Sequence, residues 1–532
     1  MNTASTRPAA RKADINSASS AKARQTPPEL STRLCQQATA AILVCAALLR
    51  FYHLELKPLH HDEGVNGFFL TRLVRDGFYH YDPANYHGST LYYFALVPTL
   101  FRFNTFAIRI VPVVFGLVTI LLILYLRRYL GTIGALTAAA LVAVSPGAVY
   151  YSRYFIHETL LVCFTVGAVV AALSYGETKR PSHLMLVSVL AALMFATKET
   201  ATIAAVVLLV AAIGAHIYIR FKGRLSQDSV KQSGHRPDRS RFARSALWVL
   251  SAAALFIAIN LAFYSSFLTY AGGVKGALET FAVWRRTSEV AHTKPWHTYL
   301  GWLLQEDSPS LLLGMSGAGL ALWRGESRFT IFAALWSLGI LAAYSLVPYK
   351  TPWLTLNMIV PLAIVGGHMV NVVYKRGKMV LAVALVCVAV TVSACQAISL
   401  NFFHYDDENS AYPYMHTRRE FLQLVNKIDQ LAEEAGTGAG TRIAVLAPEY
   451  WPLPWYLRDY RNAGFFGTAV RVPDAAIVVA APAQEMALQS SLGQDYQRID
   501  VYPLRPAVSL VLYARRALGG SPRPSGPDRV NH

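Results

Sequence analysis

The residues most suited to chemistry lie in residues 59–69, LHHDEGVNGFF, which follow closely after an apolar run. This segment places His61, Asp62 and Glu63 next to one another. Histidine and carboxylate side chains are the groups that most often move protons in general acid–base catalysis. Because neighbouring residues of an extended backbone point to opposite sides, we expect one carboxylate to face a substrate and the other a structural partner.

Three further groups of polar residues are embedded in apolar sequence. Charged side chains are costly in such surroundings and are therefore candidates for a functional role. The groups are SRYFIHE (152–158), TKET (197–200) and PYKTPW (348–353), and their charged members include Arg153, Glu158, Lys198 and Lys350.

The composition predicts a polytopic membrane protein. Of the 532 residues, 54% are hydrophobic and 15% are charged, and the mean hydropathy is +0.33. The net charge of +18 comes from basic residues at the ends of apolar runs, as the positive-inside rule predicts. No motif for reading RNA or DNA is present, so we expect no nucleic-acid partner.

Eleven apolar runs predict membrane-spanning helices, which need roughly 17 to 25 residues each. They are residues 34–49, 108–126, 132–150, 159–175, 183–197, 201–219, 246–264, 308–323, 329–347, 353–374 and 379–400.

Charge asymmetry predicts the orientation of these spans. Residues 89–103, STLYYFALVPTLFRF, are interpreted as an amphipathic segment along the membrane interface. The basic groups at 127–128, 179–180, 220–244, 324–328 and 375–378 then all lie on the cytoplasmic side. Residues 1–33 become a disordered cytoplasmic tail. Residues 51–107 become a first outer loop that carries the carboxylate pair, within a membrane domain of residues 34–400.

Residues 401–532 predict a small soluble α/β domain on the outer face. A helical stretch at 418–435 precedes strand-like runs at 442–447, 475–480 and 508–514. The sequence GTGAGT (436–441) is interpreted as a turn, because no Gly-Lys-Ser/Thr follows it. The aromatic stretch EYWPLPWYLRDY (449–460) is interpreted mainly as core packing, with stacking on sugar rings or contact with the membrane surface as alternatives.

Several motifs together resemble the GT-C superfamily of membrane glycosyltransferases, which includes protein O-mannosyltransferases and aminoarabinose transferases. After His-Asp-Glu in the first outer loop, the landmarks follow in order: AIRIVPVVFG (107–116), RRYLG (127–131), SPGAVYYSRYFIHE (145–158), FATKE (195–199) and PYKTPWLTLNMIVPLAIVGG (348–367). HHDEG and YHGSTLYYF are most similar to proteins labelled as associated with lipid-linked oligosaccharide flipping in archaeal-type glycosylation.

The resemblance implies transfer of a sugar from a polyprenyl-phosphate-linked donor to a protein, lipid or glycan acceptor on the outer face of the cytoplasmic membrane. A carboxylate takes the proton of the acceptor hydroxyl, and we assign this role to Asp62, supported by Glu63 and oriented by His61. A single displacement inverts the anomeric centre. Lys350 matches a lysine that meets the lipid phosphate in the family. Glu158 stands where a second acid, usually Asp, occurs. Further candidates for contact with substrate are Arg109, Arg153, Lys198 and His87.

Three alternatives remain open at this stage. One is a transporter or flippase for the lipid-linked sugar, and another is a scaffold of a glycosylation machine that performs no catalysis. The third concerns a divalent metal, which would be held by the histidines at positions 60, 61, 87 and 157.

Overall fold

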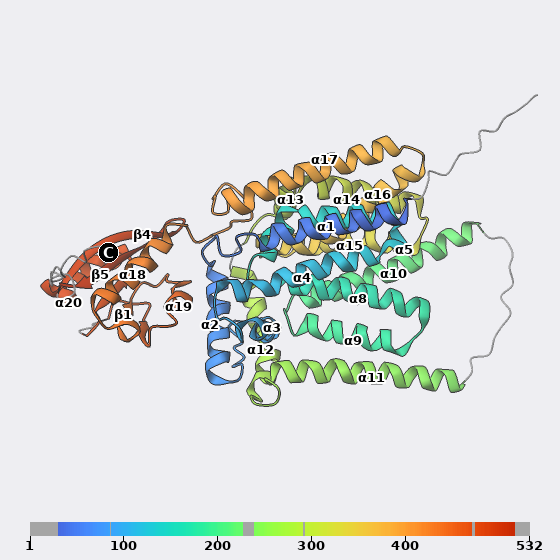
Figure 1. Cartoon of the computed structure of the whole chain (residues 1–532). Coiled ribbons are helices and arrows are strands. Elements are labelled where there is room, and N and C mark those ends of the chain that lie inside the picture. Colours follow the sequence, from blue (N-terminus) through green and yellow to red (C-terminus); the bar gives the residue numbers. More distant parts are fainter. Residues whose placement is uncertain (1–29, 86, 227–238, 291–292, 471–473, 517–532) are drawn as a thin grey trace, which may run out of the picture.

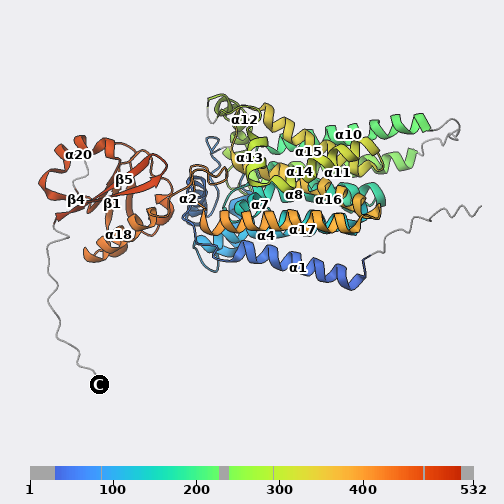
Figure 2. The ribbon, with the colours of Figure 1, turned by 90° about the horizontal axis from the view of Figure 1, so that it is seen from above.

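Figure 1 shows the computed structural model of the chain, which describes residues 30–85, 87–226, 239–290, 293–470 and 474–516. Long helices lie side by side in a bundle, and a smaller domain with a β-sheet lies beyond one end of the bundle. The view from above shows the same separation (Figure 2). Most of the predicted tail, residues 1–29, and the end of the chain from residue 517 lie outside the described residues.

Each of the eleven predicted runs forms a helix, and one run forms two helices. In chain order these are α1 (Thr32–Phe51), α4 (Thr105–Tyr125), α6 (Thr132–Val144) with α7 (Pro146–Ser152), α8 (Glu158–Thr178), α9 (Pro181–Phe195), α10 (Ala201–Ser226), α11 (Arg239–Tyr264), α14 (Ser308–Arg324), α15 (Arg328–Leu346), α16 (Leu356–Lys375) and α17 (Met379–Ile398). A short helix, α5 (Arg127–Leu130), joins α4 to α6.

The polytopic helical fold is confirmed, but fewer helices than predicted are long enough to cross a membrane. Among the described residues, eight helices have the required length and composition, and α6 with α7, bent by 59°, makes a ninth. The other two predicted spans, α9 and α14, have 15 and 17 residues. Both lie at or below the lower limit for a full crossing.

Helix α16 forms the centre of the bundle, where it packs against α6 and α14. Glycines allow this close approach: a Cβ on Gly317 of α14 would lie 2.2 Å from the carbonyl oxygen of Val365 in α16. A Cβ on Gly367 of α16 would lie 2.2 Å from the carbonyl oxygen of Gly134 in α6. Small residues at such contacts are how helices pack tightly in membranes. The 3-10 turn η1 (Pro352–Thr355) directly precedes α16.

The predicted first outer loop is largely helical. It contains α2 (His61–Asp76) and α3 (Thr90–Thr99), which lie at the bundle end next to the β-sheet domain (Figure 1). The expectation of extended backbone around the carboxylates is wrong, because α2 begins at His61. Helix α3 has 10 residues, too few to cross a membrane. Leu100 and Phe101 after it are 82% and 88% exposed, as expected for an interfacial segment.

Two further helices, α12 (Gly272–Val290) and α13 (Thr298–Glu306), connect α11 to α14. They also lie at the end of the bundle near the β-sheet domain (Figures 1 and 2). The sequence patterns did not predict them, because both helices combine polar and apolar residues and neither forms a continuous apolar run.

The C-terminal domain (residues 418–516), which we call the outer domain after its predicted location, contains a five-stranded sheet of order β2-β1-β3-β5-β4. Strand β1 (Arg442–Val445) pairs in parallel with β2 (Asn462–Phe465) and β3 (Ile477–Ala480). Strand β5 (Val508–Arg515) pairs antiparallel with β3 and with β4 (Tyr496–Arg505). Helix α18 (Phe421–Glu434) contributes the apolar residues Phe421, Leu424 and Ile428 to the core beneath the sheet. Short helices α19 (Leu453–Tyr456) and α20 (Glu485–Leu492) complete the domain.

Helix α19 and the residues before it dock the outer domain onto α2. Trp455 is buried between α2 and α4, where its indole N–H donates a hydrogen bond to Thr105 Oγ1 (3.2 Å). Glycines on α2 make room for the contact: a Cβ on Gly64 would lie 2.5 Å from Pro452 Cβ, and a Cβ on Gly67 would lie 2.6 Å from the Trp455 ring. The stretch 449–460 therefore has two functions: Leu453 and Leu457 belong to the core beneath the sheet, whereas Pro452 and Trp455 contact α2.

We expect Gly64→Ala to loosen this docking, because the added methyl group meets the backbone and ring of Pro452. Overpacking of this kind costs roughly 1–3 kcal/mol. Limited proteolysis of the full chain should release the outer domain faster than in wild type. The control is Gly440→Ala, where a Cβ meets no atom within 4 Å. Equal proteolysis of the wild type and Gly64→Ala would show that docking does not depend on this contact.

Candidate active site

The carboxylate pair occupies the first turn of α2, where the two side chains have different surroundings. The helix begins with a reciprocal cap: His60 Nδ1 accepts from the backbone N–H of Asp62 (3.1 Å), and Glu63 Oε2 accepts from the backbone N–H of His60 (3.0 Å). Such a cap satisfies donors that would otherwise lack partners at the start of a helix. Because successive residues in a helix are about 100° apart, Asp62 and Glu63 point in different directions.

Glu63 faces the protein interior and binds Arg109 of α4. The Arg109 Nε donates to Glu63 Oε1 (2.8 Å) and its second terminal nitrogen to Oε2 (2.7 Å), and both side chains are fully buried. The backbone N–H of Phe155 also donates to Oε1 (2.8 Å). Burial alone would raise the pKa of Glu63, but the Arg109 cation outweighs it and lowers the pKa. Glu63 therefore ties α2 to α4 and to the loop before α8.

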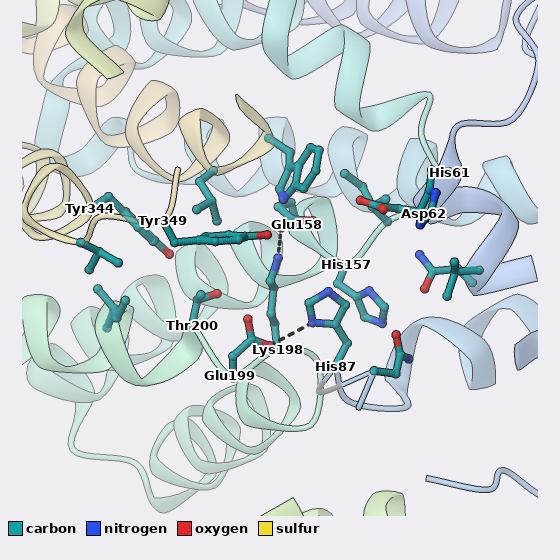
Figure 3. Close-up of a pocket in the computed structure, with 18 of the residues that line it drawn as sticks. His61, Asp62, His87, His157, Glu158, Lys198, Glu199, Thr200, Tyr344 and Tyr349 are labelled. Carbon is teal, nitrogen blue, oxygen red and sulfur yellow. Dashed lines mark hydrogen bonds and ion pairs between the residues drawn. The ribbon is translucent and has the colours of Figure 1, made fainter. Parts of the chain in front are cut away.

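Asp62 faces a cavity of about 250 Å³ at the end of the bundle nearest the β-sheet domain. The cavity is lined by residues of α2, the loop before α3, the start of α8, the α9–α10 connection and the segment after α15. Its polar lining residues are His61, Asp62, Asn66, Asn85, His87, His157, Glu158, Lys198, Glu199, Thr200, Tyr344 and Tyr349. Figure 3 shows Asp62 and His61 on one side of this space and Tyr344 and Tyr349 on the other.

Two ion pairs cross the lining of the cavity, both of which include a residue of TKET. Lys198 Nζ donates to Glu158 Oε1, and His87 Nδ1 lies 3.0 Å from Glu199 Oε2 (Figure 3). The segment 197–200 lies between the end of α9 and the start of α10, so its charged side chains belong to a connection between two helices. The structure thus brings Asp62, Glu158, Lys198 and His87 into one cavity.

The electrostatics of the cavity keep Asp62 ionised. Burial by itself would raise its pKa, but interactions with the Lys198 ammonium and with the imidazoles of His60, His61 and His87 outweigh this effect and lower the pKa. An ionised carboxylate at neutral pH is the form that can accept a proton.

The four histidines proposed as metal ligands have other partners. His60 Nε2 is 3.1 Å from the carbonyl oxygen of Tyr414, His61 Nδ1 is 2.9 Å from Arg505, and His157 Nε2 is 3.2 Å from the carbonyl oxygen of Gly88. Over the ranges that the structure describes, no group of three or more His, Cys, Asp or Glu residues is arranged to hold a metal ion. The described histidines are therefore not arranged to bind a metal ion.

Lys350 and Arg153 do not line the cavity. The ammonium group of Lys350 is buried and donates to the carbonyl oxygens of Ser345 (2.9 Å) and Val347. The Lys350 ammonium thus caps carbonyl groups at the C-terminal end of α15. The neighbouring residue Tyr349, and not Lys350, lines the cavity. Arg153 donates to the carbonyl oxygens at the end of α1, including Tyr52 (2.6 Å) and His53 (2.7 Å).

Other cavity residues were not singled out from the sequence. Asn66 lies one helical turn after Asp62 and uses its amide N–H to bind the Phe155 carbonyl oxygen (2.8 Å). The i to i+4 spacing from Asp62 is the signal that would have identified it. Tyr344 looks like an ordinary residue near a helix end, and no sequence pattern marks it.

Comparisons with known proteins match both the sequence and the fold. The profile of a family described as dolichyl-phosphate-mannose-protein mannosyltransferase matches residues 89–225. No curated protein matches the chain. The crystal structure of ArnT from Cupriavidus metallidurans bound to undecaprenyl phosphate has a TM-score of 0.65 at 13% identity, and the match covers 93% of this chain and 100% of that chain.

A second solved structure is the archaeal oligosaccharyltransferase AglB from Archaeoglobus fulgidus, in complex with an inhibitory peptide and a dolichol-phosphate. Its TM-score is 0.50 at 12% identity, covering 85% of this chain and 70% of that chain. At these identities the similarity establishes the fold. The narrower likeness to flippase-associated proteins stays a prediction.

Proposed function

We propose that this chain, whose fold is that of the GT-C membrane glycosyltransferases, transfers a sugar from a polyprenyl-phosphate donor to an acceptor hydroxyl. The observation that carries the proposal is the polar cavity in which the ionised Asp62 and the Lys198 ammonium both take part. One solved relative, ArnT, was crystallised with undecaprenyl phosphate, which supports a donor of the polyprenyl-phosphate class.

In the proposed reaction the acceptor oxygen attacks the anomeric carbon while Asp62 takes the hydroxyl proton. The bond between the anomeric carbon and the phosphate oxygen breaks, and its electron pair leaves with the polyprenyl phosphate. Direct displacement by the acceptor inverts the anomeric centre. Asp62 then returns its proton to solvent. A well-placed base of this kind contributes roughly 10²–10⁴-fold to the rate.

Lys198 is the cation that we assign to the donor phosphate. Charge accumulates on the phosphate oxygens as the bond breaks, and a fixed cation lowers that barrier. In the absence of donor, Glu158 pairs with Lys198 and holds the charged ammonium in the cavity lining. This assignment differs from the sequence-based one, because the Lys350 ammonium is used by the carbonyl oxygens of α15.

The remaining polar groups suit the hydroxyls of a sugar. Asn66, Asn85 and the His87–Glu199 pair offer both donors and acceptors within one lining. A cavity of about 250 Å³ suits a monosaccharide unit, and the polyprenyl chain would then lie along the membrane.

The proposal places the cavity and the outer domain on the outer face of the cytoplasmic membrane. We expect Arg75→Cys on α2 and Asn426→Cys on α18 to react with a membrane-impermeant thiol reagent added to intact cells. Thr178→Cys, at the other end of α8, should react only after the membrane is opened. All three positions are exposed. Labelling of Thr178→Cys alone in intact cells would reverse the proposed orientation.

The function is tested with purified protein in vesicles that contain polyprenyl-phosphate sugars and a membrane extract as the source of acceptors. Mass spectrometry should show loss of one lipid-linked sugar and release of free polyprenyl phosphate that depends on the extract. If the lipid-linked sugar moved from one leaflet of the vesicle membrane to the other and was not consumed, a flippase would be favoured instead. Donor binding without either change would favour a scaffold.

A further inference from the structure

A residue of the outer domain reaches the cavity wall. Arg505 lies at the end of β4 and is only 6% exposed. Its terminal nitrogen Nη1 is 2.9 Å from Nδ1 of His61, and its other terminal nitrogen donates to Glu449. His61 lines the cavity beside Asp62 (Figure 3), so this contact links the two domains at the proposed site.

The chemistry of arginine fixes the state of the imidazole. A guanidinium group has only N–H donors and remains charged in proteins. The ring nitrogen that it contacts must therefore be the acceptor. In the neutral imidazole the other nitrogen, Nε2, then carries the proton.

We propose that Arg505 is a positioning residue, which holds His61 as the neutral tautomer with its proton on Nε2 and so makes it a hydrogen-bond donor in the cavity wall. With Nδ1 occupied and Nε2 protonated, His61 has no lone pair left to accept a proton. In the reaction, His61 would bind an oxygen of the ligand, and Asp62 would be the base. This last step rests on the proposed function, whereas the state of the ring does not.

The charges around His61 support this state. Burial lowers its pKa below the ordinary value, and the Arg505 cation lowers it further. The carboxylates of Asp62 and Glu449 oppose the shift and raise the pKa, but they do not reverse it. The ring of His60, on the same chain segment, and the indole of Trp451 are the other groups that face His61, with ring centroids 6.5 and 6.2 Å away.

The docking of the outer domain holds Arg505 at this distance. Pro452 and Trp451 pack on Gly64, one turn after His60, and Glu449 precedes this contact in the chain. The role of the outer domain in this proposal is thus to set the hydrogen-bonding state of His61, which lines the cavity.

The direct test is nitrogen-15 NMR of the full chain labelled at histidine, with His61→Gln to assign the signal. In wild type at neutral pH, we expect the His61 signals of a bare Nδ1 and a protonated Nε2. A protonated Nδ1, or a charged ring at neutral pH, would overturn the proposal. The NMR measurement needs neither a lipid-linked sugar nor an acceptor molecule. If the proposed sugar transfer were wrong, the expected state of the His61 ring would still be testable.

Variants identify Arg505 as the cause. In Arg505→Met the His61 titration midpoint should move to higher pH and the single tautomer should be lost, while Arg505→Lys, which keeps the positive charge, should restore most of the shift. The matched control is Arg498→Met on the same strand, where the arginine pairs with Glu485 instead. An unchanged His61 midpoint in Arg505→Met would contradict the proposal. Limited proteolysis, calibrated with Gly64→Ala, reports whether the domain is still docked.

Discussion

Asp62→Asn is expected to lower the turnover of lipid-linked sugar by about 10²–10⁴-fold. The asparagine keeps the shape of the side chain but cannot take the proton from the hydroxyl group that receives the sugar. Folding should be retained, because the side chain is 37% exposed and lies on the cavity side of α2. Losing a negative charge in the first turn of the helix costs only about 0.3–1 kcal/mol.

The measurement is the release of polyprenyl phosphate in vesicles, together with the dissociation constant of the donor. Turnover should fall while the donor constant stays nearly unchanged, because the lost interaction belongs to the transition state. Asp76→Asn is the matched control: it makes the same change at the other end of α2, where Asp76 pairs with the exposed Arg75. Wild-type turnover in Asp62→Asn would eliminate Asp62 as the base.

Glu63→Gln should strongly destabilise the fold instead of acting on the reaction step. It leaves the Arg109 guanidinium buried without its carboxylate, and breaking a buried pair on one side costs roughly 3–5 kcal/mol. The same change weakens the cap of α2 and the contact with the Phe155 N–H. Thermal unfolding in detergent should show a large drop in the midpoint.

A surface pair provides the control for this prediction. Arg75→Gln breaks the exposed Arg75–Asp76 pair, and such pairs contribute at most about 1 kcal/mol. The double variant Glu63→Leu with Arg109→Leu should recover part of the stability, since apolar replacements of buried pairs are often neutral. If Glu63→Gln unfolds at the wild-type temperature, the pair does not hold α2 in place.

The helical fold could be predicted from the sequence because each membrane helix carries its own signal, a long apolar run between basic ends. The run at 353–374 is one case, and α16 follows it closely. The number of membrane crossings could be predicted less accurately from the sequence. An apolar run does not show where a helix ends or bends: α9 and α14 are short, and α7 begins at Pro146 with a bend of 59° from α6.

In the outer domain, β1, β3 and β5 were predicted because they are dense in apolar residues, whereas β2 and β4 were missed. Strand β2 has the sequence NAGF, and β4 alternates charged and apolar residues beside irregular pairing. Such strands are specified mainly by their partners in the sheet.

The candidate site was predicted in part for a related reason. The run of histidines and carboxylates identified Asp62, and charged residues in apolar sequence identified Glu158 and Lys198; the cavity brings all three together. The same signal also selected Arg153 and Lys350, because a buried cation that closes a helix end looks identical in sequence to one that faces a ligand. No sequence pattern indicated a role for Arg505, because it contacts His61, which lies 444 positions away in the sequence.

The role of Asp62 in sugar transfer can be measured by mass spectrometry of polyprenyl-phosphate sugars and surface glycans in cells that lack the protein, complemented with wild type or with Asp62→Asn. The proposed function predicts that one lipid-linked sugar accumulates, that one glycan loses a residue, and that only the wild type restores both. Equal restoration by the two versions would contradict the account, because the transfer would then proceed without the carboxylate of Asp62.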